Sequence, residues 1–157
     1  MPSSATAKIK SAPSRLFSGV IIAVALCILA AAMIIVRTRA SFAVLRVGGQ
    51  AYHLEIAATP AAQQKGLGGR ATMPVDQGML FLFDHPALEC FWMKDMHFAL
   101  DIVWLDANQR IGAIESNVSP STYPRTFCPK LPAKYVIELD AGRAAVVGLR
   151  VGQSLTW

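Results

Sequence analysis

The sequence predicts a mainly β fold: one compact β-sandwich or partly closed barrel with one or two short helices, preceded by a transmembrane helix. Three observations lead to this prediction. Short apolar runs, separated by turn-forming residues, continue from residue 42 to the end of the chain. The central runs hold enough large apolar residues for one core, and no segment is repeated. An uncharged apolar stretch precedes all of these runs.

This stretch, residues 16–36, is a candidate membrane anchor. Its 21 residues include neither a charged residue nor a proline. A helix of this length spans roughly 30 Å, the thickness of the hydrocarbon core of a bilayer. Cleaved signal peptides have a shorter apolar region of about 7–15 residues. We therefore expect an uncleaved signal anchor between a disordered basic tail (residues 1–15) and a linker (residues 37–43).

The distribution of charge supports the anchor and argues against nucleic acid as a partner. Residues 1–41 carry five basic and no acidic residues, whereas residues 42–157 carry ten of each. The folded part therefore lacks the basic surface that nucleic-acid binding needs. A slight excess of basic residues before the apolar stretch favours a cytoplasmic N-terminus. We expect a single-pass protein of the cytoplasmic membrane, with its domain on the extracytoplasmic side.

The domain is expected to begin with a hairpin and a short helix. Residues 42–47 and 51–57 alternate in the manner of strands on either side of a Gly-Gly turn. A helix is predicted between Thr59 and Gly66, because Thr caps helix N-termini and Gly commonly ends helices.

Further strands and a second helix are predicted in the rest of the domain. The strands are expected at residues 78–83, 90–94, 98–105, 110–116, 134–140 and 153–157. Four prolines in residues 117–132 predict a long irregular loop. One or two helical turns are expected within residues 142–147.

Five short motifs of the domain together resemble the bacterial and archaeal family of unknown function numbered 192. The motifs are Gly66-Leu67-Gly68-Gly69-Arg70, Gly78-Met79-Leu80-Phe81, Phe91-Trp92-Met93-Lys94, Leu100-Asp101-Ile102, and Tyr135-Val136-Ile137-Glu138-Leu139 with Ala141-Gly142. The resemblance covers about residues 44–157 and implies one compact β-rich domain, often behind a signal or anchor segment. It implies no activity. One departure is Gly68, near which the family pattern would place Met.

Four charged residues in these motifs form a candidate site: Arg70, Lys94, Asp101 and Glu138. Asp101 interrupts an apolar run, and a buried carboxylate needs a partner. Arg70 is the partner that we predict, because its planar guanidinium pairs well with carboxylates. The cluster is then either a structural ion pair that fixes the Gly-rich loop or a charged pocket for a polar or anionic ligand.

Trp92 and two cysteines are further candidates. The indole of Trp92 fits either a ligand groove or the core. Cys90 and Cys128 form a disulfide if the domain lies in an oxidising compartment, and are otherwise buried free thiols. A soft metal site at Cys90, Met93, Met96 and His97 is not expected, because strand alternation turns Cys90 and Met93 to opposite faces. We expect neither a metal nor a cofactor.

The motifs of common enzyme classes are missing from the sequence, including G-x-S-x-G, H-E-x-x-H, C-x-x-C and the P-loop. We therefore expect a binding or accessory module of the cell envelope, whose partner is an envelope protein or a small polar ligand. The alternative is an envelope hydrolase or lyase. It would use Asp101 or Glu138 as acid or base and Arg70 or Lys94 to hold the substrate.

Overall fold

The computed structural model describes residues 22, 24–28 and 41–157, and the chain divides into two units, Met1–Arg39 and Ala40–Trp157. The described residues of the first unit are helical. The expected tail and most of the expected anchor and linker lie outside the described residues. Among the residues that are described, none belongs to a helix long and apolar enough to span a bilayer.

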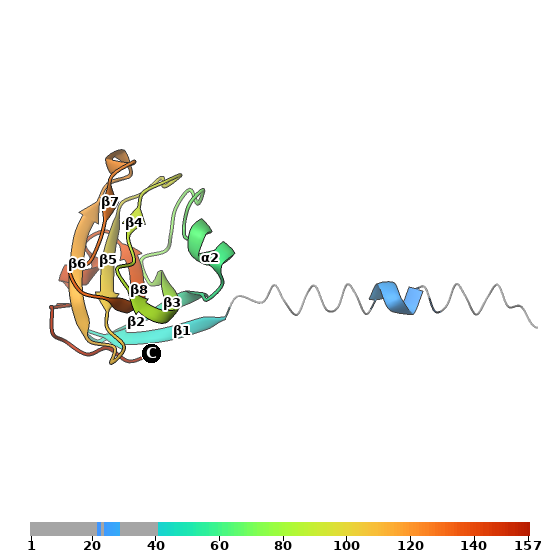
Figure 1. Ribbon diagram of the computed structural model, residues 1–157, viewed down its shortest axis with the longest axis horizontal. Helices are drawn as coiled ribbons and strands as arrows, with labels where there is room; N and C mark the ends of the chain where they lie inside the picture. Colours follow the sequence, from blue (N-terminus) through green and yellow to red (C-terminus); the bar gives the residue numbers. More distant parts are fainter. Residues whose placement is uncertain (1–21, 23, 29–40) are drawn as a thin grey trace, which may run out of the picture. The chain divides into compact units, whose positions relative to one another are not determined.

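The second unit is built on one mixed sheet of six strands (Figure 1). In spatial order these are β1 (Phe42–Val47), β2 (Gln50–Ala57), β3 (Gln77–Ala87), β8 (Ala133–Asp140), β5 (Leu100–Leu105) and β6 (Ile111–Val118). β2 and β3 are parallel, and every other neighbouring pair is antiparallel. The predicted mainly β class is confirmed.

Shorter elements accompany the sheet. They are α2 (Pro60–Lys65), the 3-10 helix η1 (Pro120–Thr122), α3 (Arg143–Val146), and a two-stranded sheet of β4 (Phe91–Trp92) and β7 (Thr126–Phe127). α2 lies in the connection between the parallel strands β2 and β3, which cannot be joined by a tight turn.

The local predictions near the start of the domain are confirmed. The β1–β2 turn contains Gly48 and Gly49, both with positive φ, a backbone conformation that favours glycine. The side chain of Thr59 accepts a hydrogen bond from Ala62 N, and Gly66 follows the last residue of α2.

The two faces of the central strands carry separate hydrophobic clusters. Leu80, Val103 and Ile137 pair across β3, β5 and β8 and belong to one cluster. Their neighbours Phe81, Trp104 and Val136 face the other way and belong to the second. Both faces are buried, which explains why these strands read as continuous apolar runs.

Three element predictions need correction. Residues 153–157 are not a strand, and make only an isolated bridge between Arg110 and Ser154. The strand expected at residues 90–94 is reduced to Phe91–Trp92, because the chain turns at Asp95, which has positive φ. The proline-rich segment 117–132 contains η1 and β7. Within this segment β7 pairs with β4, which is distant in the sequence.

Candidate functional site

Glu138 is a buried carboxyl group without a complete set of partners. β8 places it opposite Met79 and Ile102, beside the hydrophobic cluster that contains Phe81 and Trp104. Its exposed fraction is 5%, and Oε2 finds no hydrogen-bond partner among the described residues. Burial raises the pKa of Glu138 to about 8, against a smaller opposing effect of the charge on Arg70. The group is therefore protonated at neutral pH and can donate as well as accept a hydrogen bond.

Glu138 lines a pocket of about 310 Å³, which we call the Glu138 pocket. Its walls come from the end of α2 and the following Gly-rich loop, from β3, from residues 89–92 and from the loop 94–96. Leu67, Phe81 and Glu138 are its buried side chains and form its inner wall. The rest of the lining is partly exposed and combines polar side chains with aromatic ones such as Phe91 and Trp92. A pocket of this size is sufficient for a small molecule.

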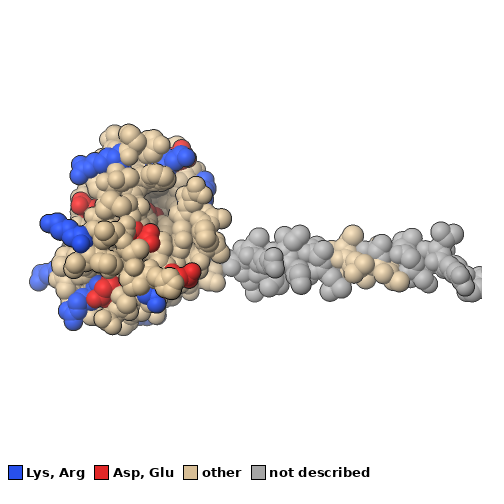
Figure 2. Space-filling model, viewed as in Figure 1, with Lys and Arg blue, Asp and Glu red and all other residues tan. Residues whose placement is uncertain are grey.

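The charged groups around the Glu138 pocket balance one another. Lys65 and Lys94 contribute two positive charges, and Glu89 and Asp95 contribute two negative ones. Figure 2 likewise shows acidic and basic side chains interspersed on the face in view. With Glu138 protonated, the lining has no net charge.

Close backbone contacts hold the two loops of the pocket together. Gly69 N donates a hydrogen bond to Asp95 O at 2.7 Å. A Cβ atom at Gly68 would lie 3.1 Å from Lys65 O and 3.3 Å from Lys94 O. The absence of a side chain at Gly68 therefore lets these loops approach. A Met at this position, as the family pattern suggests, would require them to separate.

The predicted contact between Arg70 and Asp101 is wrong. Arg70 donates instead to Glu55 Oε2 at 2.6 Å, in an ion pair that is about one-third exposed. Asp101 is fully buried and accepts hydrogen bonds from Asn117 N at 2.9 Å and Ala144 N at 2.8 Å. It thereby caps the first turn of α3. It also gives a backbone N–H of β6 a hydrogen-bond partner near the point where the register with β5 shifts.

Asp101 also lies on the opposite face of the sheet from Glu138. Asp101 pairs with Leu139, and its neighbour Ile102 pairs with Glu138. Since successive side chains alternate between faces, the two carboxyl groups point away from each other. The structure brings Trp92, Lys94 and Glu138 to one pocket, places Arg70 beside it, and leaves Asp101 in a structural position.

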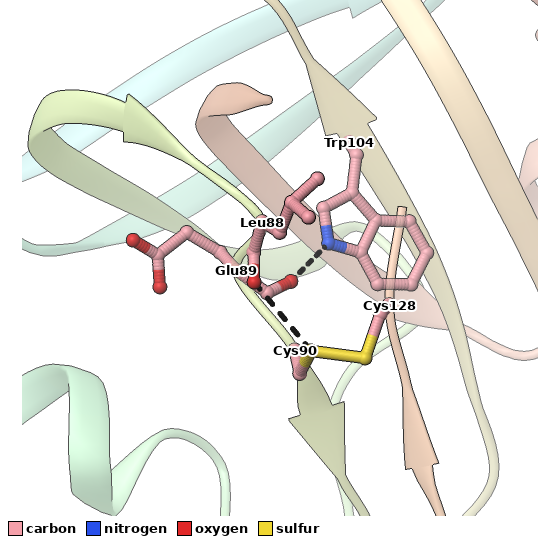
Figure 3. The surroundings of a disulfide bond; sticks show 5 residues. All are labelled: Leu88, Glu89, Cys90, Trp104 and Cys128. Atoms are coloured by element: carbon pink, nitrogen blue, oxygen red, sulfur yellow. Dashed lines mark hydrogen bonds between the residues drawn. A yellow bond between two sulfur atoms is a disulfide. The ribbon is translucent and has the colours of Figure 1, made fainter. Parts of the chain in front are cut away.

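Cys90 and Cys128 form a disulfide, which joins one wall of the pocket to the residue after β7 (Figure 3). The same wall is fixed by Trp104, whose Nε1 donates to Glu89 O at 2.7 Å. Trp92 is not a core residue: it is 49% exposed, lines the pocket, and packs against Tyr123 with ring centroids 6.5 Å apart.

Sequence reasoning did not single out Lys65, Glu89 and Asp95 as members of the site. They belong to three segments that meet only in the folded chain, and no local motif marks them. In the part of the chain that the structure describes, no three His, Cys, Asp or Glu side chains come together in a way that would hold a metal ion.

The mixed sheet and the pocket around a buried carboxyl group define a small pocket-bearing β domain. Residues 43–157 match the model of the DUF192 family, described as Uncharacterized ACR, and the chain belongs to this family.

Two crystal structures have the same fold. One, a protein of unknown function from Novosphingobium aromaticivorans DSM 12444, is 28% identical, with a TM-score of 0.71 over 76% of this chain and 88% of its own. The other, described as a "putative transcription regulator" from Sinorhizobium meliloti 1021, is 31% identical, with a TM-score of 0.65 over 74% of this chain and 95% of its own. No functionally curated protein matches the chain.

Proposed function

We propose that this chain is a membrane-anchored binding or accessory module of the cell envelope, and that its domain holds a small polar ligand in the Glu138 pocket. The observation that carries the proposal is the buried carboxyl group of Glu138, whose Oε2 has no partner among the described residues. A buried polar atom without a hydrogen bond costs about 1–3 kcal/mol. Glu138 also lines the pocket, so a ligand bound there can offer its carboxyl group a hydrogen-bond partner.

Two features support the extracytoplasmic location. The apolar stretch at residues 16–36 has the length of a single membrane span. The disulfide between Cys90 and Cys128 is of a kind that persists in oxidising compartments and is rare in the cytosol.

The description of the Sinorhizobium relative as a regulator is not extended to this chain. Residues 42–157 carry equal numbers of acidic and basic residues. Acidic groups also lie among the basic ones on the face shown in Figure 2. Because binding to phosphates depends on a basic surface, we propose no nucleic-acid partner.

One observation favours the alternative of an envelope hydrolase or lyase. A carboxyl group that is protonated at neutral pH can serve as a general acid, and Lys94 lines the same pocket. Asp101 cannot take part, because it lies on the opposite face of the sheet. Appearance of a product during incubation with a bound ligand would favour the enzyme, and recovery of the ligand unchanged would favour the binding module.

The unit Ala40–Trp157 is suited to the test, because it contains both hydrophobic clusters. In addition, the match covers 95% of the Sinorhizobium relative, so that protein was crystallised as little more than this domain. Its thermal unfolding would be followed with a panel of small polar molecules, since a ligand raises Tm by mass action. Glu138→Leu removes the polar group and creates no new unpaired buried atom. The exposed Glu115→Gln, on β6, is the matched control.

We expect at least one ligand to raise Tm of both the wild type and the control. Its affinity for Glu138→Leu should be roughly 10–100-fold lower, because the substitution removes about one hydrogen bond to a buried group. If no compound of the panel raises Tm, or if Glu138→Leu binds as well as the wild type, the proposal is overturned.

A further inference from the structure

One wall of the Glu138 pocket carries Trp92, and the ring of Tyr123 packs against it. Trp92 and Tyr123 are 49% and 47% exposed, and their rings meet at 78° with centroids 6.5 Å apart. They belong to the chain around the β4–β7 sheet, close to the disulfide that fixes this wall. Large aromatic surfaces left open to solvent on a rigid support commonly mark a binding surface. Trp92 also lines the pocket, so this surface is continuous with it.

The charge of the lining selects the kind of ligand. Lys65 and Lys94 are matched by Glu89 and Asp95, so the lining offers neither an anionic nor a cationic ligand a net attraction. A charged ligand would give up its hydration without a net electrostatic gain. A neutral ligand meets no such penalty and is the best match.

The hydrogen-bonding groups of the lining are both donors and acceptors. The ammonium groups of Lys65 and Lys94 donate, the carboxylates of Glu89 and Asp95 accept, and the amide of Gln64 does both. Burial keeps a proton on Glu138 at neutral pH, so its carboxyl group also does both. A ligand with several hydroxyl groups suits this lining, because each hydroxyl donates one hydrogen bond and accepts others.

We propose that the Glu138 pocket binds a neutral carbohydrate, with the apolar face of a sugar ring stacked on Trp92 and its hydroxyl groups bonded to the polar lining. A carbohydrate combines what the other observations require separately: no net charge, many hydroxyls, and a flat C–H face that packs on an indole. This inference rests on the proposed function and names the class of its ligand.

The test is calorimetric titration of the unit Ala40–Trp157 with neutral mono- and oligosaccharides, alongside their uronic-acid and amino-sugar counterparts. Trp92→Ala removes the stacking surface and Trp92→Phe retains part of it. Phe42→Ala is the matched control, because Phe42 is an aromatic residue of β1 that is 61% exposed and is not among the pocket-lining residues. Tm of each variant checks that it is folded.

We expect a neutral sugar to bind the wild type and Phe42→Ala equally, Trp92→Ala at least tenfold more weakly, and Trp92→Phe between them. The uronic-acid and amino-sugar forms should both bind more weakly than the neutral form. Equal or tighter binding of a charged form, or binding that Trp92→Ala and Glu138→Leu leave unchanged, would overturn the inference.

The remaining outcomes separate this inference from the proposed function. If no sugar binds but another polar molecule binds in a manner that depends on Glu138, the carbohydrate inference fails and the proposed function stands. If nothing binds in the pocket, both fail.

Discussion

Glu138 links the stability of the domain to pH. Its pKa is about 8 in the folded domain, against 4.5 for an ordinary Glu. Between these values the folded state binds one proton more than the unfolded state. The stabilising contribution is therefore complete below about pH 4.5 and is lost as pH rises toward 8, with a slope of up to about 1.4 kcal/mol per pH unit.

Urea unfolding at several pH values between 5 and 8 measures this effect. We expect the free energy of unfolding of the wild type to fall with rising pH relative to that of Glu138→Gln, which carries no titrating group at this site. Glu115→Gln, at an exposed position of β6, should follow the wild type. Parallel curves for the wild type and Glu138→Gln would mean that Glu138 is ionised in the folded domain.

The two hydrogen bonds that Asp101 accepts lead to a second prediction at the scale of residues. In Asp101→Asn one acceptor oxygen is replaced by an NH₂ group, which leaves Asn117 N or Ala144 N without a partner. We expect a loss of about 2–3 kcal/mol in the free energy of unfolding. The loss should add to that of Arg70→Ala, because Arg70 does not bond to Asp101.

A double-mutant cycle in urea checks this prediction. The comparison cycle pairs Arg70→Ala with Glu55→Gln, whose coupling should be below about 1 kcal/mol because the ion pair is partly exposed. Strong coupling between Arg70 and Asp101 would contradict this prediction and would mean that the two residues form the ion pair that the sequence suggests.

The sequence located several residues of the candidate site but not their partners. An acidic residue in an apolar strand is recognisably special, and this marks both Asp101 and Glu138. Which residue lies opposite depends on strand order and register, which no local pattern contains. The sequence therefore suggests Asp101 as the partner of Arg70, whereas in the fold Arg70 pairs with Glu55 on β2.

At the scale of elements, the disulfide fixes the wall that carries Trp92. It closes a loop of 38 residues, for which the chain-entropy estimate is about 3–4 kcal/mol. We expect the double substitution Cys90→Ala/Cys128→Ala to lower the free energy of unfolding by about this amount. It should also weaken the binding of any ligand that contacts Trp92. Urea unfolding and calorimetry measure the two effects.

Reduction of the wild-type domain should reproduce both effects, and the same reductant should leave the double variant unchanged. Equal stability of the wild type with and without reductant would show that the bond contributes nothing to folding.

Elements were predictable where their determinants are local. The Gly-Gly turn fixes the β1–β2 hairpin, and Thr59 with Gly66 brackets α2. β7 has no local signal, because its two residues are in a strand only through their pairing with β4, some 35 residues earlier in the chain. The parallel pairing of β2 and β3 likewise depends on contacts between separate segments.

At the scale of the whole molecule, short apolar runs separated by turn-forming residues predict a mainly β fold with one or two short helices. The alternation of buried and exposed residues does not distinguish one mixed sheet from two packed sheets. The difference lies in the strand order: the crossover through α2 makes β3 parallel to β2, and β8 pairs with both β3 and β5.

The arrangement of the complete chain in the membrane is the last prediction. Residues 16–36 are long and apolar enough to span a bilayer, and the five basic residues on either side of them account for the net charge of +5. If the domain lies outside the cytoplasm, Cys90 and Cys128 are oxidised in living cells and reachable from outside.

The full chain, expressed in bacteria, should resist extraction from membranes by carbonate. A membrane-impermeant thiol reagent added to spheroplasts should label Cys90 and Cys128 only after prior reduction, and a Cys90→Ala/Cys128→Ala variant should remain unlabelled. Recovery of a soluble chain that begins near Ala40 would mean that the apolar stretch is a cleaved signal. Labelling that requires lysis but no reductant would place the domain in the cytoplasm, where the thiols would be free.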